Sequence, residues 1–268
     1  MLQQKAVVLW NRQVGPQLYR MGLACAMDRA AARPGQFVML QIGNHHAPLL
    51  RRPFSIFGLV GDANKPEGLE LLYRVVGRGT SMLAGCSPGQ HLDILGPLGR
   101  GFDLAHAPRA NQRYYLAAGG IGVAPIRFLA HHLIHSGYAA GNCHVFLGGR
   151  NRSDLMCRDD FVDLGMALTV TTDDGSAGDQ CLITDPLQTA VLSRPPATLF
   201  ACGPPGMLRC IAGIAEKSKI PCQVSMETMM ACGMGACLGC AVEGSDPDRP
   251  YWHVCKDGPV FESGRIKW

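Results

Sequence analysis

Four cysteines near the end of the chain have a spacing that suits an iron–sulfur cluster. Cys232, Cys237, Cys240 and Cys255 form the pattern C-x4-C-x2-C-x14-C, within the strings ACGMGACLGC and WHVCKDG. This is the plant-type spacing of [2Fe–2S] ligands, in which four thiolates surround two iron atoms. Glycines between the cysteines give the loop backbone freedom, and alanines beside them leave room for N–H groups to point at the sulfur atoms. The spacing therefore predicts a [2Fe–2S] site.

A structural zinc site is the alternative, because Zn²⁺ also takes four cysteines. Zinc ribbons pair their ligands in C-x2-C knuckles, and the glycine-flanked triplet here differs from that pattern. Iron–sulfur is therefore favoured. Cys222, ten residues before Cys232, is expected to be a core strand residue rather than a ligand. The seven cysteines between Cys25 and Cys210 are interpreted as small buried hydrophobic residues.

Two glycine-rich turns are suited to binding a dinucleotide. LAAGGIGVAP places Gly119, Gly120 and Gly122 between an expected strand and helix, and FACGPPGML places Gly203 and Pro204 after a later strand. Backbone N–H groups at such a turn, together with the positive end of the following helix, bind a pyrophosphate. One such turn can equally be a tight corner without a ligand. Two turns at neighbouring strand ends would frame a single crevice.

Charged residues near the later strand ends bear on the choice between NAD and NADP. Arg150 and Arg152 could bind the 2′-phosphate of NADP, but Asp154 follows them. Asp173 and Asp174, in the string TDDGS, stand at the expected carboxyl end of the next strand, where carboxylates could accept hydrogen bonds from the ribose of NAD. Arginines in such loops are usually solvated, so this pattern favours NAD.

The elements that would position these residues fall into three segments. Residues 5–100 contain short β-type runs separated by turns, including Pro-Gly at 34–35 and 88–89, which predicts a small antiparallel barrel or sandwich. Strands then alternate with helices, among them one over SDLMCRDDFVDL, which predicts a parallel sheet with crossover helices. The expected domains are therefore 1–108, a barrel; 109–221, an α/β nucleotide-binding domain; and 222–268, a small module held by its cluster.

Composition limits the class of protein. Of 268 residues, 47% are hydrophobic and 17% charged, which indicates a globular chain. The net charge of +4 forms no basic run, which argues against nucleic-acid binding. No uninterrupted apolar stretch reaches about 18 residues, and the first residues do not resemble a signal peptide, so a cytoplasmic location without a membrane span is expected. Twelve cysteines in that setting point to metal or redox chemistry.

The string Arg52-Pro53-Phe54-Ser55 resembles the RxxS flavin motif of the ferredoxin–NADP⁺ reductase superfamily, and Gly77 to Thr80 resembles the glycine stretch that follows it there. Together with GGIGVAP, CGPPGML, TDDGS and VCKDGPVF, these motifs make the whole chain similar to one family, the electron-transfer subunits of two-subunit, NAD-dependent dihydroorotate dehydrogenases.

The resemblance implies an FAD-binding barrel and assigns roles to several residues. Arg52 would pair with the FAD pyrophosphate, and Ser55 would bind the flavin edge where hydride arrives. Cys202 would lie near the nicotinamide ring. The residues implied to line the flavin or hold its diphosphate are Pro53, Phe54, Leu72, Tyr73, Arg74, Gly79 and Thr80.

The resemblance implies electron transfer as the activity. A catalytic FMN-containing partner subunit, in a heterotetramer, would oxidise dihydroorotate to orotate in pyrimidine biosynthesis, and electrons would pass through the cluster and FAD to NAD⁺. A flavin suits this position because it connects one-electron and two-electron carriers.

Two alternative functions remain. One is an NAD(P)H-handling subunit of a sulfhydrogenase or of a ferredoxin:NAD(P)⁺ reductase complex. Another is a zinc-stabilised binding module without enzymatic activity.

Overall fold

The chain folds into two compact units, seen in a computed structural model that describes residues 2–26, 32–43, 48–62, 65–104 and 112–268. The barrel unit comprises Met1–Gly101, Glu227–Val242 and His253–Pro259, and the sheet unit comprises Phe102–Met226, Glu243–Trp252 and Val260–Trp268. The expected boundary between residues 108 and 109 lies outside the described residues. The expected third segment, 222–268, contributes to both units.

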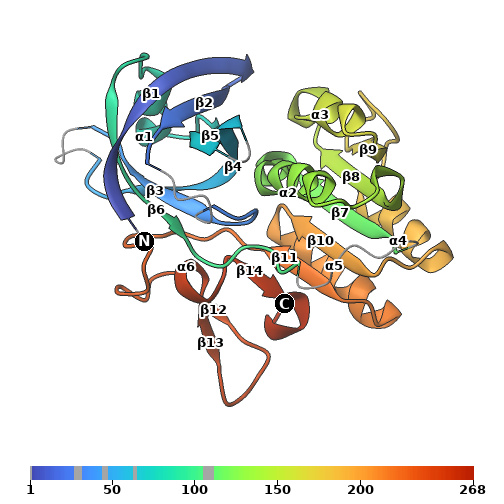
Figure 1. Cartoon of the computed structure of the whole chain (residues 1–268). Coiled ribbons are helices and arrows are strands. Elements are labelled where there is room, and N and C mark those ends of the chain that lie inside the picture. Colours follow the sequence, from blue (N-terminus) through green and yellow to red (C-terminus); the bar gives the residue numbers. More distant parts are fainter. Residues whose placement is uncertain (1, 27–31, 44–47, 63–64, 105–111) are drawn as a thin grey trace. The chain divides into compact units, whose positions relative to one another are not determined.

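The barrel unit contains the predicted antiparallel barrel, which has six strands. It closes in the order β1-β2-β5-β4-β3-β6, because β1 pairs with β2 on one side and with β6 on the other (Figure 1). Its core consists of apolar side chains, and β3 is buried along its whole length. The elements are β1 Leu2–Gly15, β2 Leu18–Ala24, β3 Phe37–Gln41, β4 Arg52–Asp62, β5 Lys65–Arg74, α1 Arg78–Ala84 and β6 His91–Leu98.

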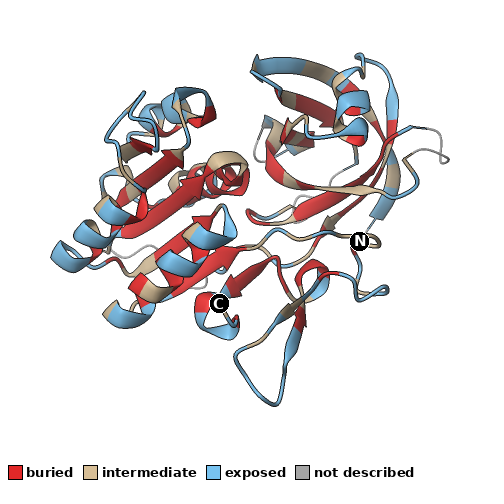
Figure 2. Cartoon of the chain, turned by 180° about the vertical axis from the view of Figure 1, so that it is seen from behind, coloured by how far each residue is buried: buried red, intermediate tan, exposed pale blue. Residues whose placement is uncertain are grey.

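The sheet unit contains the predicted parallel sheet with crossover helices. Its strand order is β14-β11-β10-β7-β8-β9, and all pairs are parallel except that of β11 and β14. The chain runs outward from β7 to β9 and then returns to β10 on the other side of β7, which defines a doubly wound sheet with a switch point between β7 and β10. The central strand β7 is buried throughout (Figure 2).

Helices α2 and α3 pack against each other, as do α4 and α5. The α-helices are α2 Val123–His135, α3 Arg158–Asp163, α4 Thr184–Ser193 and α5 Pro205–Ser218, and the short 3₁₀ turns are η1 Gly120–Gly122, η2 Ala140–Asn142 and η3 Arg152–Asp154. The strands are β7 Tyr114–Gly119, β8 Cys143–Gly149, β9 Ala167–Thr172, β10 Thr198–Cys202 and β11 Cys222–Ser225.

One helix is shorter than the sequence suggested. The pattern SDLMCRDDFVDL predicted a continuous helix, but α3 begins only at Arg158. Cys157 has a φ of 63°, in the left-handed region, and a regular α-helix cannot pass through that conformation.

The last part of the chain is more regular than its sequence pattern indicated. It forms β12 Ala241–Glu243, β13 Tyr251–His253, α6 Val254–Asp257, β14 Val260–Glu262 and η4 Ser263–Arg265. Strand β14 pairs with β11 and so extends the large sheet. Three-residue strands carry too little periodicity to be read from sequence. Among the helices of the described residues, none combines the length and hydrophobicity needed to span a bilayer.

The two glycine turns meet at the switch point. A Cβ atom added to Gly122 would lie 2.6 Å from the carbonyl oxygen of Cys202 and 2.7 Å from the nitrogen of Gly203. These contacts are too short for any side chain, so Gly122 allows the two turns to touch.

We expect Gly122→Ala to destabilise the sheet unit by about 1–3 kcal/mol, because the added methyl group must push two backbone segments apart. Gly213→Ala is the matched control: Gly213 lies inside α5 with open space at its Cβ position. Its replacement should raise stability by up to about 1 kcal/mol. Thermal unfolding followed by circular dichroism measures both changes, and equal midpoints for the two variants would contradict the close contact.

Candidate functional site

The four predicted cluster ligands belong to the barrel unit and lie in two pairs. Cys240 and Cys255 have their sulfur atoms 3.2 Å apart, and the thiol of Cys237 is hydrogen-bonded to Cys232. Two thiolates bound to one tetrahedral metal ion are roughly 3.8 Å apart for metal–sulfur bonds of about 2.3 Å. Each pair is thus close to the spacing that one iron atom requires, and two pairs suit a cluster of two irons.

Backbone N–H groups point at these sulfur atoms. Met234 and Cys237 each donate to Cys232 Sγ at 3.4 Å, and Gly235 donates to Cys255 Sγ at 3.1 Å. Burial alone would raise the pKa of Cys232, but the hydrogen bonds outweigh it and lower the pKa to about 6. The loop is therefore arranged to stabilise negative charge on sulfur, as a thiolate ligand needs.

Glycines allow the loop to take this path. Gly233 and Gly235 have φ angles of 73° and 84°. A Cβ atom at Gly233 would lie 2.5 Å from Met39 Cγ, and one at Gly235 would lie 2.8 Å from Lys256 Cδ. The loop therefore depends on glycine both for its conformation and for its close packing against the barrel and α6.

The two cysteine pairs differ in exposure. Cys240 and Cys255 are each 2% exposed, whereas Cys232 is half-buried and Cys237 is exposed. Around the exposed pair, apolar side chains also face solvent: Met229 is 88% exposed and Leu238 is 58% exposed. One side of the candidate cluster thus lies near the protein surface.

The predicted flavin motif opens strand β4, where Arg52 to Ser55 pair with β3. The guanidinium of Arg52 donates to the carbonyl of Leu50 at 2.7 Å, and its Nε lies 3.6 Å from the Cβ position of Gly79. Gly79 is buried at the start of α1. A cation and the first N–H groups of a helix therefore meet at one place, which is a chemistry suited to a diphosphate.

Other predicted flavin residues are hydrogen-bonded within the protein or are partly or fully buried. The hydroxyl of Thr80 accepts hydrogen bonds from Val76 and Gly77 and donates to the Gly77 carbonyl, so it serves the turn before α1. The neighbours Leu72 and Tyr73 are both buried, and Arg74 and Ser55 are half-buried.

Sequence reasoning missed Asn11 as a positioning residue. Its side-chain oxygen accepts a hydrogen bond from the Tyr73 hydroxyl at 2.9 Å, and its amide donates to carbonyls at the end of α1, among them that of Leu83 at 2.9 Å. The Tyr73 ring also stacks with Tyr19 and meets the edge of Phe54. Burial raises the pKa of Tyr73, and the bond to Asn11 only partly opposes this. A single asparagine in a β-strand carries no sequence signal for this role.

The predicted dinucleotide turns lie side by side, since β7 and β10 are adjacent parallel strands. A Cβ atom added to Gly203 would lie 3.1 Å from the nitrogen of Gly119, and Pro204 precedes the first turn of α5. Gly120 has a φ of 55° and open space at its Cβ position. Cys202 is 1% exposed. The arrangement matches the crevice at which doubly wound sheets bind their ligands.

The charged residues beyond β8 and β9 form specific pairs. Arg150 Nε donates to Asp154 at 2.8 Å, and Arg152 donates through two N–H groups to the carbonyl of Ser176. Asp174 accepts a hydrogen bond from the Ser176 backbone, and its bonds to Ser176 lower its pKa. Asp173 is exposed beside them.

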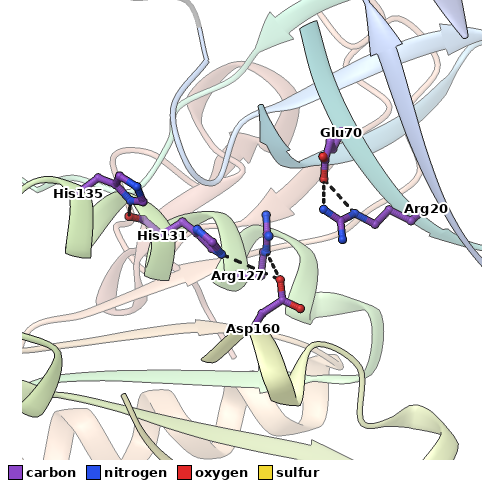
Figure 3. A network of polar contacts seen from close by, with 6 residues as sticks. All are labelled: Arg20, Glu70, Arg127, His131, His135 and Asp160. Atoms are coloured by element: carbon purple, nitrogen blue, oxygen red, sulfur yellow. Dashed lines mark hydrogen bonds and ion pairs between the residues drawn. The ribbon is translucent and has the colours of Figure 1, made fainter. Parts of the chain in front are cut away.

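Figure 3 shows two further charged pairs, one in each unit. On α2, Arg127 donates to Asp160 at 2.8 Å, while His135 donates to the carbonyl of His131 at 2.7 Å. In the barrel, Arg20 pairs with Glu70 at 2.6 Å. The α2 histidines thus contact their own helix and an ion pair that joins α2 to α3.

Comparison with known proteins identifies two segments of the chain. Residues 227–267 match the family model of the iron–sulfur cluster binding domain of dihydroorotate dehydrogenase B, and residues 116–213 match that of the oxidoreductase NAD-binding domain. The structure of an NADH-dependent reduced ferredoxin–NADP oxidoreductase superposes with a TM-score of 0.81 at 25% identity, over 98% of this chain and 90% of that one. A ferredoxin NADP⁺ reductase from Neisseria gonorrhoeae, with bound FAD and NADP, shares the fold with a TM-score of 0.65 at 14% identity, over 81% of this chain and 91% of that one.

The fold and the sites define an oxidoreductase of the ferredoxin–NADP⁺ reductase type with an added iron–sulfur domain. Two relatives carry the name dihydroorotate dehydrogenase B (NAD⁺), electron transfer subunit. That of Desulforamulus reducens is 37% identical over 98% of this chain and 97% of its own length, and that of Geobacillus kaustophilus is 35% identical over 98% of each. The chain belongs to this family of electron transfer subunits.

Family membership and the two domain matches confirm the predicted class, an oxidoreductase subunit for electron transfer with FAD, an iron–sulfur cluster and NAD as its cofactors. They also decide against the zinc alternative, because the matching C-terminal domain is an iron–sulfur domain. An electron transfer subunit implies a catalytic partner subunit.

We expect serine at Cys232, Cys237, Cys240 or Cys255 to remove or weaken the cluster, because each iron needs two thiolates. Cys222→Ser is the control: Cys222 is buried in β11, where burial raises its pKa to about 12, and its loss should leave the cluster in place. Iron and acid-labile sulfide analysis, with the visible spectrum, measures the outcome. Normal iron content in two or more of the four ligand variants would refute the assignment.

Proposed function

We propose that this chain transfers electrons between a catalytic dihydroorotate dehydrogenase subunit and NAD⁺, through a [2Fe–2S] cluster on its four paired cysteines and FAD on its barrel. The observation that carries the proposal is the pairing of these cysteines in a chain that matches a named relative over 97% of that relative's length. The candidate flavin residues and the cluster ligands belong to the same compact unit, which supports direct electron exchange between the two groups.

The partner is proposed to be the FMN-containing subunit that oxidises dihydroorotate to orotate in pyrimidine biosynthesis, in a heterotetramer. The support is the relatives' name, which describes an electron transfer subunit of dihydroorotate dehydrogenase B. The cytoplasm is the proposed location, because none of the twelve cysteines, all within the described residues, forms a disulfide, as is usual in a reducing compartment.

The exposed side of the cluster loop is the proposed contact with the partner. Met229, Met234 and Leu238 expose 88%, 44% and 58% of their surface around the more accessible cysteine pair. Leu238 also holds a φ of 59°, a conformation that is unfavourable for leucine. Exposed apolar residues beside a redox centre suit a protein contact that excludes water.

Specific roles are also proposed at the other two sites. Arg52, Gly79 and Thr80 would hold the FAD diphosphate, with Ser55 at the flavin edge. The glycine turns at 119–122 and 203–204 would hold the dinucleotide pyrophosphate, with Cys202 near the nicotinamide. The contacts of Arg52 with Gly79, and of Gly122 with Cys202, support these assignments.

We expect Arg52→Ala to reduce FAD retention, because hydrogen bonds from a guanidinium to a diphosphate contribute about 1.5–3 kcal/mol each. Arg51→Ala is the matched control, since Arg51 binds Asp93 of β6 at 2.6 Å. Flavin content after dialysis should fall for the first variant and not for the second. Equal retention in both would remove Arg52 from the flavin site.

We expect Leu238→Glu to weaken binding of the catalytic subunit at least tenfold, because a charge would be buried at the contact. Leu192→Glu, at a site 71% exposed on α4, is the control. Co-expression followed by size-exclusion chromatography and titration calorimetry compares the two. An unchanged affinity in Leu238→Glu, with the cluster intact, would contradict the proposed contact surface.

A further inference from the structure

The pair of Arg150 and Asp154 is unequal in its exposure. The Asp154 side chain is only 6% exposed, while that of Arg150 is 74% exposed, and the two meet at 2.8 Å between Nε and Oδ2. Burying a carboxylate is unfavourable unless it is paired. The ion pair with Arg150 therefore compensates the burial of the Asp154 carboxylate, and it holds an otherwise exposed guanidinium in place.

The pair lies at the carboxyl edge of the parallel sheet, the edge at which doubly wound folds bind dinucleotides. Arg150 follows β8, which lies beside β7 and its glycine turn, and the backbone beyond β9 joins it through a bond from Asp174 N to the Arg150 carbonyl. In doubly wound sheets, ligands bind at the carboxyl ends of the strands, and an acidic or a basic residue there distinguishes NAD from NADP.

Both arginines of this loop, Arg150 and Arg152, already donate hydrogen bonds to acceptors within the protein. The side-chain hydrogen bond and charge of Asp154, with a further contribution from the charge of Asp173, raise the pKa of Arg150. Arg152 uses its Nε and one Nη for the carbonyl of Ser176. A 2′-phosphate, with a charge of about −1.5 to −2, would meet carboxylates here and would have to compete with Asp154 for Arg150.

We propose that Asp154 is the residue that sets the preference of this chain for NAD over NADP. By binding Arg150 it withholds the guanidinium from a 2′-phosphate, and it acts through Arg150 rather than by touching the dinucleotide. The inference rests on the proposed function only in that the dinucleotide binds at this edge of the sheet.

The test replaces Asp154 by asparagine, which removes the charge and keeps the shape. In the FAD-loaded chain, with ferricyanide as acceptor, the ratio of kcat/KM for NADH to that for NADPH should fall at least tenfold. Adenosine 2′,5′-bisphosphate should bind at least tenfold more tightly by calorimetry, while 5′-AMP binding stays within about twofold. Asp154→Ser serves the same purpose if the asparagine variant does not fold.

Two controls separate this role from a general effect. Asp163→Asn makes the same charge change at an exposed position at the end of α3, and it should leave the ratio unchanged. In the double variant Asp154→Asn with Arg150→Gln, the gain toward NADPH and the bisphosphate should disappear, because Arg150 supplies it.

The outcomes are distinct. An unchanged cofactor ratio and unchanged bisphosphate affinity in Asp154→Asn would overturn the inference, as would a gain that persists without Arg150. Failure of the unaltered chain to oxidise NADH would instead count against the proposed function. A gain that depends on Arg150 supports the assignment of Asp154.

Discussion

The close packing of the loop 232–240 on the barrel is the contact on which the iron–sulfur site depends. Gly233 lies against Met39 without room for a Cβ atom, and from there the loop directs N–H groups at Cys232 and Cys255. A short, glycine-rich loop cannot hold such a conformation alone, because ordering its backbone costs conformational entropy. The barrel supplies the rigid surface, and the bound cluster would supply the remaining stabilisation.

Each compact unit is assembled from segments that are far apart in the sequence, and the candidate redox sites are grouped by unit. Residues 227–242 and 253–259 return to the barrel, so the candidate ligands of the two one-electron partners, cluster and flavin, share one unit. The dinucleotide turns lie in the other unit, at the switch point of its sheet. A dinucleotide bound at these turns would therefore occupy a different unit from a flavin bound at Arg52 and Gly79.

Several arginines in both units form ion pairs with aspartates. Arg51 with Asp93, Arg127 with Asp160, and Arg150 with Asp154 are each held by a partly or fully buried carboxylate. Arg52, by contrast, bonds only to carbonyl oxygens among the contacts described for it, and it lies beside Gly79. An arginine bound to neutral acceptors keeps its net charge available for an anion, whereas a paired arginine does not.

The sequence by itself determined the barrel, the parallel sheet, the cysteine motif and the family, because strand and helix periodicity, glycine turns and ligand spacing are local signals. It did not show that α3 would begin only after Cys157, that β14 would join the large sheet, or that residues after 222 would be shared between two units. Only the tertiary structure decided the pairing of the four cysteines, the role of Asn11, and the contact that binds Arg150 to a buried Asp154. The first two features depend on which side chains meet across the fold. The third joins residues only four positions apart, and there the fold decides how deeply Asp154 is buried. Neither is encoded in the spacing of residues along the chain.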